Sequence, residues 1–286
     1  MTFVVVFPGQ GSQKVGMGDT LFQKYRDVTD TANRILGYSI EELCLRDPHT
    51  QLTVTEYTQP ALYTVNALMY FDFREKNKEE PVMFAGHSLG EYNALLAAGA
   101  FDFETGLRLV KKRGELMNKA SEGGMAAVLG MNKERIAEVL KQNHADSIDI
   151  ANFNSPDQII ISGPKQDIEK AQAYFEHAGA KKYLKLNVGA AFHSRYMKNA
   201  QESFANFLSD FQFNVLTVPV ISNHTAKPYS ENIHAHLIQQ ISNSVLWEQS
   251  IQYILQKYHE CKFEEIGPGK VLAGLIKQIR SYFQKS

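Results

Sequence analysis

Short apolar runs alternate with long stretches of helical periodicity in the first part of the chain. The run Phe3–Phe7 is followed by a turn-rich loop at 8–13, and the run 82–85 leads directly into a glycine-containing turn. Apolar residues recur at helical spacing through most of 20–77 and again through 92–120. Uninterrupted apolar strands between helices are typical of a parallel sheet covered on both faces. The pattern therefore predicts an α/β layer.

From residue 123 the predicted strands and helices are shorter and follow one another more closely. The pattern there predicts strands at 125–129, 148–151, 158–162 and 182–188, with helices at 133–143 and 165–178. The order β-α-β-β-α-β is that of a ferredoxin-like unit, which is compact enough to be inserted into another domain. We expect a small subdomain at 123–189 within a larger α/β domain formed by 1–122 and 190–286.

The α/β pattern returns after Gly189. It predicts strands at 216–222 and 263–266 and a closing helix from Val271. Proline cannot donate a hydrogen bond to a neighbouring strand, so Pro219 indicates an edge position or an interrupted strand.

Composition narrows the class of protein. The 286 residues are 44% hydrophobic, enough for a substantial core. Thirty basic and 31 acidic residues give a net charge of −1, so no general attraction to nucleic acid or an anionic membrane is expected. No apolar run is long enough to span a bilayer. The start of the chain lacks the pattern of a secretory signal, so we expect it to be a buried strand.

Cysteine and histidine spacing argues against a metal site. Cys44 and Cys261 are far apart, and neither they nor the nine histidines form a metal-ligand pattern. Reduced thiols of this kind are typical of a cytoplasmic protein.

Residues 86–91 read Gly-His-Ser-Leu-Gly-Glu. Between a strand and a helix, the Gly-x-Ser-x-Gly pattern predicts a nucleophile elbow, a sharp turn that exposes the central serine. The following helix directs its free N–H groups to the same point. An ordinary structural turn can have the same pattern, and the flanking strand and helix favour the catalytic interpretation. We predict that Ser88 is a nucleophile.

A serine nucleophile needs a base within hydrogen-bonding distance, and histidine is the usual one. His87 is adjacent to Ser88, but neighbours in a tight turn point in different directions. His193 lies where the chain leaves the predicted subdomain and re-enters the larger domain, and it is our candidate. On spacing alone, a surface or helix-capping histidine stays an open alternative.

The loop Gly9-Gln10-Gly11-Ser12-Gln13 lies beside the elbow if the first two strands are neighbours. The backbone N–H groups of Gln10 and Leu89 could then bind an oxyanion. A phosphate-binding loop is the alternative, but its usual Gly-Lys-Ser/Thr or Gly-x-Gly-x-x-Gly sequence is absent.

Arg113 follows Lys111 and Lys112 in a predicted helix. A run of charges on a helix is usually a solvated face, which is our interpretation of the two lysines. An inward-facing arginine differs, because its planar guanidinium binds a carboxylate through two parallel hydrogen bonds. In that orientation Arg113 would select an acyl group with a free carboxylate.

Together these motifs resemble the malonyl-CoA:acyl carrier protein transacylase family. In chain order, the resemblance is carried by residues 9–13, 86–91, 113–117 and 191–194, with agreement at 152–156 and 267–272. It implies an α/β-hydrolase-like domain with a ferredoxin-like insertion, the same division that the pattern predicts. Discrete acyltransferases that act in trans on polyketide synthases look most similar, although the fatty-acid enzyme shares the same core.

The resemblance implies a Ser–His pair without an acidic third member. Ser88 would attack the thioester of malonyl-CoA with His193 as general base, and the malonyl group would then pass to the phosphopantetheine thiol of an acyl carrier protein. The amides of Gln10 and Leu89 would bind the oxyanion, and Arg113 would bind the malonyl carboxylate. No cofactor is implied, since the coenzyme A thioester is the substrate.

Further residues receive supporting roles by the same resemblance. The backbone carbonyl near Gln240 would orient His193, Asn243 is a candidate to assist, and Asn154 belongs to one of the agreeing segments. In related domains a phenylalanine before the histidine, here Phe192, accompanies malonyl selection. Its ring leaves little room for a substituent at C2, and one methyl group is worth only about 1–3 kcal/mol of discrimination.

Two other functions stay open. An acyl-thioester hydrolase would share the elbow but would not need Arg113, and a non-catalytic module that docks a carrier protein would not need the nucleophile.

Four cations are candidate contacts for an acidic carrier protein or for coenzyme A phosphates, although ordinary surface charge also explains them: Lys14, Lys181, Lys182 and Arg195.

Overall fold

The computed structural model describes residues 2–120, 122–230 and 232–284, and it contains two four-stranded sheets. The first sheet is entirely parallel, in the order β7-β2-β1-β8. Its strands are β1 (Phe3–Phe7), β2 (Met83–Gly86), β7 (Val220–Ile221) and β8 (Lys262–Glu265). The carboxyl ends of β1 and β2 are therefore neighbours, as the sequence analysis requires for the loop at 9–13 to lie beside the elbow.

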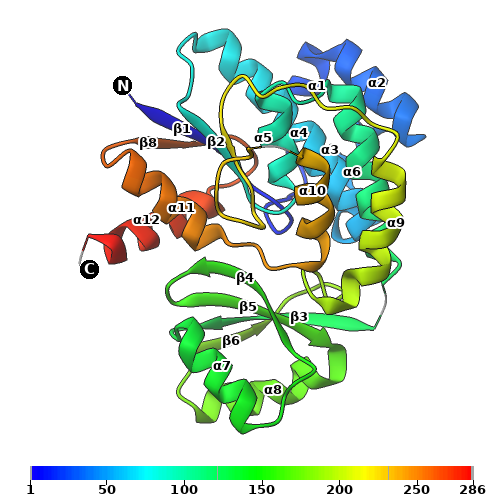
Figure 1. Cartoon of the computed structure of the whole chain (residues 1–286). Coiled ribbons are helices and arrows are strands. Elements are labelled where there is room, and N and C mark those ends of the chain that lie inside the picture. Colours follow the sequence, from blue (N-terminus) through cyan, green and yellow to red (C-terminus); the bar gives the residue numbers. More distant parts are fainter. Residues whose placement is uncertain (1, 121, 231, 285–286) are drawn as a thin grey trace.

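Helices cover both faces of the parallel sheet (Figure 1). The helices of this larger part are α1 (Leu21–Lys24), α2 (Arg26–Leu36), α3 (Ile40–Arg46), α4 (Thr55–Lys76), α5 (Gly90–Ala97), α6 (Phe103–Asn118), α9 (Lys198–Leu208), α10 (Ile233–Ser242), α11 (Trp247–Lys257) and α12 (Val271–Phe283), with the short 3₁₀ helices η1 (Gln51–Thr53) and η2 (Arg195–Met197). Because side chains alternate along a strand, Val5 and Phe7 pack in the core with α4 and α5, whereas Val4 and Val6 pack with α11 and α12.

The second sheet is antiparallel and has the order β4-β5-β3-β6. Its strands are β3 (Gly123–Leu129), β4 (Asp149–Ser155), β5 (Gln158–Pro164) and β6 (Lys182–Lys185). Helix α7 (Lys133–Gln142) follows β3, and helix α8 (Lys165–His177) follows β5. Figure 1 shows α7 and α8 on the side of this sheet that faces away from the larger part. The β-α-β-β-α-β order and the strand order are ferredoxin-like, so the predicted fold class is confirmed. The domain limits, 1–122 with 190–286 and 123–189, stay a prediction.

Backbone contacts join the two parts where they meet. Phe153 of β4 donates to the carbonyl of Val245, and Val245 donates to the carbonyl of Ala151. Gly123 packs so closely against the returning chain that a Cβ there would lie 2.1 Å from the amide nitrogen of Ala191. The segment that carries His193 is thus fixed next to the start of β3.

Two predicted strands are shorter in the structure. Of residues 216–222 only Val220–Ile221 forms a strand, at the edge of the sheet, because Thr217 bonds to the carbonyl of Ala98 instead of to β2. The strand expected at 182–188 ends at Lys185, and Leu186 adds one last hydrogen bond to Met125 before the chain turns toward the larger part. Among the described residues, the helices are too short or too polar to cross a membrane.

Candidate active site

Ser88 lies in the sharp turn between β2 and α5, with its backbone in the left-handed region at φ 51°. Such a conformation costs a non-glycine residue about 1–3 kcal/mol and is often found at functional sites. The flanking glycines make the turn possible. A Cβ on Gly86 would lie 2.0 Å from the backbone of Gly90, and a Cβ on Gly90 would lie 2.1 Å from the carbonyl oxygen of Phe7.

His193 lies directly opposite the serine. Its Nε2 is 2.7 Å from Ser88 Oγ, although the two residues are 105 positions apart in the chain. The histidine is only 4% exposed and is itself left-handed at φ 55°, a feature that the sequence did not predict. The structure thus brings together the predicted nucleophile and base.

The other ring nitrogen determines which tautomer His193 adopts. Nδ1 lies 2.8 Å from the carbonyl oxygen of Gln240, and a carbonyl oxygen only accepts, so we assign the proton to Nδ1. Nε2 then has a free lone pair for the serine proton. Burial and, to a smaller extent, the positive charge of Arg113 lower the pKa of His193 to about 3. Backbone groups of Gln240 and Asn243 act in the opposite direction. The ring is therefore neutral at neutral pH and able to act as a base.

Arg113 extends from α6 to the serine and is 1% exposed. Its Nη1 donates to Gln59 Oε1 at 2.6 Å, and its Nη2 donates to Gln240 Oε1 at 2.9 Å and to Ser88 Oγ at 3.1 Å. Among the described residues its Nε has no hydrogen-bond partner, and no carboxylate forms an ion pair with it. A buried guanidinium without a carboxylate partner is suited to bind the carboxylate of a ligand next to the nucleophile.

Three further polar residues at the site were missed by the sequence analysis. Gln59 binds Arg113, Asn223 Oδ1 accepts the backbone N–H of Ser88 at 2.6 Å, and Glu91 bonds to Asn223 and to Gln240. Gln59 and Asn223 lie far from the elbow in sequence, in segments without a recognisable motif. Glu91 did leave a signal, because it is an acidic residue at the start of a helix that is mostly apolar and buried.

The loop after β1 contacts the elbow. A Cβ on Gly9 would lie 2.3 Å from the carbonyl oxygen of His87, so only glycine permits this approach. Gln10 and Leu89 both line the cavity at Ser88, and among the described residues neither backbone N–H donates to another protein group. The side chain of Gln10 is bonded to Thr55. Two backbone N–H groups that line the cavity at the serine and have no protein partner among the described residues are available to bind an oxyanion.

These residues line a cavity of about 400 Å³ between the two parts of the chain. Phe192, 6% exposed, forms part of its wall next to His193. Three apolar side chains that also line the cavity, Leu184, Leu186 and Val271, are partly exposed and thus open to solvent. The cavity combines apolar walls with a few polar groups at the serine, as small-molecule sites usually do.

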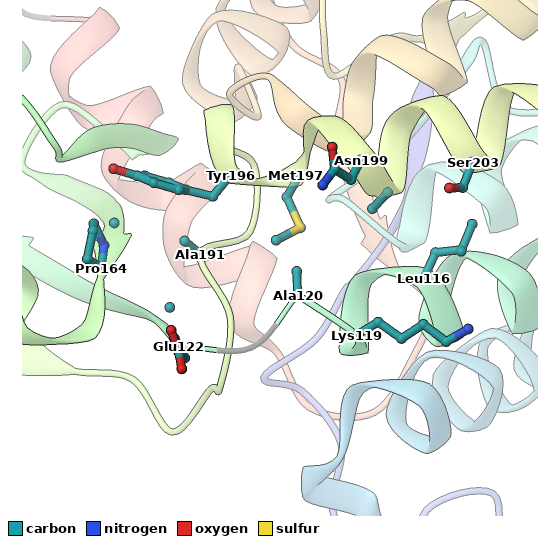
Figure 2. A pocket seen from close by; sticks show the side chains of 13 residues that line it. Leu116, Lys119, Ala120, Glu122, Pro164, Ala191, Tyr196, Met197, Asn199 and Ser203 are labelled. Carbon is teal, nitrogen blue, oxygen red and sulfur yellow. The ribbon is translucent and has the colours of Figure 1, made fainter.

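A second cavity of about 600 Å³ lies on the other side of the returning chain, between the end of α6 and the start of α9 (Figure 2). Its lining includes Ala191, Leu116 and Tyr196, and none of the predicted site residues is among the described residues that line it. The segment 190–193 therefore separates the two cavities, and the chemistry belongs to the smaller one.

The two remaining supporting residues, Asn154 and Asn243, make side-chain contacts away from Ser88 and His193. Asn154 Oδ1 lies 2.8 Å from Nε2 of His87, whose ring also packs edge-on against Trp247, so His87 points away from the base position. The side chain of Asn243 donates to Gln239 and, among the described residues, not to His193. Only the backbone of Asn243 acts on the histidine.

The four candidate cations, Lys14, Lys181, Lys182 and Arg195, are all exposed. Arg195 is different, since its guanidinium and backbone N–H bond to Asp149. Its charge is already compensated, which makes it the weakest of the four candidates.

Both cysteines are buried free thiols, and burial raises the pKa of each. Within the part of the chain that the structure describes, no group of three or more histidine, cysteine, aspartate or glutamate residues could bind a metal ion.

A serine nucleophile with a neutral histidine base and a buried, unpaired arginine defines a site for serine-dependent acyl transfer. The acyl transferase domain family matches residues 4–280, and the chain belongs to this family. It is 55% identical to the polyketide biosynthesis malonyl CoA-acyl carrier protein transacylase PksC of Bacillus subtilis, covering 96% of both chains. It is 40% identical to the malonyl CoA-acyl carrier protein transacylase of Escherichia coli K12, covering 97% of this chain and 92% of that protein.

Solved structures show the same fold. The malonyl CoA-acyl carrier protein transacylase from Burkholderia pseudomallei has a TM-score of 0.96 at 47% identity, with 98% of each chain covered. A malonyl-transacylase in complex with its type II PKS acyl-carrier protein has a TM-score of 0.92 at 35% identity, with 98% of this chain and 94% of that one covered.

Proposed function

We propose that this enzyme transfers a malonyl group from malonyl-CoA to the phosphopantetheine thiol of an acyl carrier protein, through a malonyl ester of Ser88. The observation that carries the proposal is the buried Arg113, whose guanidinium lies 3.1 Å from Ser88 Oγ without a carboxylate partner among the described residues. A simple thioester hydrolase has no use for such a charge. The names of the relatives in the family support the same substrate and partner.

In the first half-reaction, Ser88 Oγ attacks the thioester carbonyl carbon while Nε2 of His193 accepts the hydroxyl proton. The amides of Gln10 and Leu89 bind the resulting oxyanion. When the intermediate collapses, the carbon–sulfur bond breaks, and the departing coenzyme A sulfur takes the proton from His193. The malonyl group remains on Ser88 with its carboxylate on Arg113.

In the second half-reaction, the thiol of the carrier protein gives its proton to the neutral His193 and attacks the serine ester. The ester carbon–oxygen bond breaks, and Ser88 Oγ recovers the proton. The carbonyl of Gln240 keeps Nδ1 protonated throughout and stabilises the charged ring through its dipole, in the place where many serine enzymes have a carboxylate.

Phe192 restricts the acyl group in this proposal. Because it is buried in the cavity wall next to His193, its ring limits the space at C2 of the acyl chain. We propose malonyl as the preferred group and a weaker, measurable acceptance of methylmalonyl.

We also propose that the enzyme acts in trans in polyketide biosynthesis. The identity of 55% to a protein named for polyketide biosynthesis, against 40% to the Escherichia coli transacylase, supports this assignment over fatty-acid synthesis. The two free cysteines support a cytoplasmic location.

Intact-protein mass spectrometry tests the proposal. Incubation with malonyl-CoA is expected to add one malonyl group to the wild-type chain and none to Ser88→Ala. Addition of a holo carrier protein should move the group to the carrier. Release of free malonate without a malonyl carrier would instead identify a hydrolase, and an absent adduct would identify a non-catalytic protein.

A further inference from the structure

Glu91 is a buried carboxylate that the reaction scheme above does not use. It is 0% exposed, in the first turn of α5, three residues after the nucleophile. Its Oε1 accepts from the backbone N–H of Asn223 at 3.1 Å and from the hydroxyl of Tyr229, and its Oε2 accepts from Gln240 Nε2 at 2.6 Å. A buried charge is costly unless it is well hydrogen-bonded, and this one has three donors.

Two of these donors also bind the backbone of the nucleophile. Asn223 Oδ1 accepts the N–H of Ser88 at 2.6 Å, and Gln240 Nε2 donates to the carbonyl oxygen of Ser88 at 2.9 Å. Both peptide groups of the left-handed serine are therefore bound by the side chains of two residues that also bond to Glu91, Asn223 through its backbone N–H and Gln240 through its side chain. A strained conformation persists only when its surroundings fix it in this way.

The carboxylate also determines which way the amide of Gln240 points. An ionised carboxylate accepts but does not donate, so it must face the NH2 group. The amide oxygen is then left for Arg113, which donates to it at 2.9 Å. In the reversed orientation the NH2 group would face the guanidinium, and both would be donors.

We propose that Glu91 is a positioning residue of the transfer reaction, whose ionised carboxylate fixes the amide of Gln240 in the orientation that binds both Arg113 and the carbonyl of Ser88. This inference rests on the proposed function. The proposal gives Gln240 two roles. The backbone carbonyl of Gln240 bonds to His193, and its side chain connects Arg113 to the elbow.

Polar and charged groups around the carboxylate favour its ionised form against the effect of burial. Burial raises the pKa of Glu91 to about 7, while hydrogen bonds from Tyr229 and Gln240 and the positive charge of Arg113 oppose the shift. Tyr92, beside it on α5, is fully buried, and the ring of His236 from α10 packs edge-on against Tyr229. The only cation whose charge acts on Glu91 among these groups is Arg113, across the amide of Gln240.

A double-mutant cycle tests the proposal with Glu91→Gln, Gln240→Leu and the double variant. In Glu91→Gln the new amide presents a donor to Gln240 Nε2, so the amide of Gln240 must turn over or lose its contacts. We expect kcat/KM for malonyl loading to fall by about 10- to 100-fold, as for other displacements of positioning groups. In the Gln240→Leu background, where no amide can be oriented, the same substitution should change kcat/KM by less than about threefold.

A second readout separates positioning from plain structural support. Because Arg113 loses Gln240 as one of its partners, the preference for malonyl-CoA over acetyl-CoA should fall by about tenfold in Glu91→Gln. The control is Glu248→Gln, a half-buried glutamate on α11 that bonds only to Gln252 among the described residues; it should change neither quantity.

Circular dichroism confirms that each variant folds. If Glu91→Gln does not, Glu91→Asp takes its place in the same cycle, because the shorter carboxylate cannot reach Gln240. Additive losses in the cycle, or an equal loss with both thioesters, would overturn the proposal. Failure of the wild-type protein to load malonyl at all would instead refute the proposed function.

Discussion

Arg113 offers the sharpest perturbation of substrate selection. Replacing it by alanine removes a guanidinium that is 1% exposed and that donates to Gln59, Gln240 and Ser88 Oγ. With malonyl-CoA, the substitution leaves the substrate carboxylate in a buried site without a charged partner. With acetyl-CoA, no carboxylate is present and this loss does not arise. Arg113→Ala should therefore change the ratio of the two rates more than it changes acetyl transfer itself.

The size of the effect follows from the geometry. Removing one partner of a buried, hydrogen-bonded charge pair costs about 2–5 kcal/mol, and we take about 3–4 kcal/mol here because the arginine is almost completely buried. At about 1.4 kcal/mol per factor of ten, kcat/KM for malonyl loading should fall by about 10²- to 10³-fold. Arg113→Lys should lose about tenfold, since it keeps the charge but cannot bind Gln59, Gln240 and a carboxylate at once.

The assay is the rate of acyl-enzyme formation with malonyl-CoA and with acetyl-CoA, followed by quenched-flow mass spectrometry. Arg108→Ala is the matched control, because Arg108 lies on the same helix but is 49% exposed and pairs only with Glu104 among the described residues. A surface pair of this kind contributes little. Equal losses with both thioesters in Arg113→Ala, or malonyl loading at the wild-type rate, would refute the assignment of this residue as the carboxylate site.

Three further predictions concern substrate size, pH and backbone packing. Phe192→Ser should raise the relative kcat/KM for methylmalonyl-CoA by about tenfold, as measured by competition between the two thioesters, and an unchanged ratio would remove Phe192 from the specificity site. Because burial lowers the pKa of His193 to about 3 and raises that of Glu91 to about 7, kcat/KM should decrease as Glu91 gains a proton below pH 7. This acid limb should disappear in Glu91→Gln, and its persistence would assign it to another group. Gly90→Ala should lower the thermal midpoint and abolish loading, because its Cβ would lie 2.1 Å from the carbonyl oxygen of Phe7, whereas Gly274→Ala in open space should gain about 0.5–1 kcal/mol of stability. Equal midpoints for these two glycine variants would contradict the packing account of the elbow.

Local patterns were enough to predict the layers and the nucleophile. The first strand, the β-α-β-β-α-β order and the turn at Ser88 each depend on neighbours in sequence, such as apolar runs and glycines at fixed spacing. His193 was a candidate base from its place between the predicted domains, but only the resemblance connected it to Ser88, since no local rule connects residues that are 105 positions apart.

Contacts over long sequence distances explain what the sequence did not predict. The strand expected at 216–222 is short because Thr217 bonds to Ala98, a loop residue far away in the chain. Gln59 and Asn223 are ordinary polar residues in sequence, and only the fold places them against Arg113 and Ser88. Asn243 was a candidate to assist His193, and only its backbone acts on the histidine, because its side chain bonds to Gln239, one helical turn away.

The central claim is that Ser88 carries a malonyl group between two thiols. The most direct measurement is a two-step transfer, in which the isolated malonyl-enzyme, freed of malonyl-CoA, is mixed with a holo carrier protein and both proteins are weighed by mass spectrometry. The account predicts that the enzyme loses one malonyl group while the carrier gains one, and that Ser88→Ala and His193→Ala give no malonyl carrier. Malonyl transfer at the wild-type rate by the Ser88→Ala variant would contradict it.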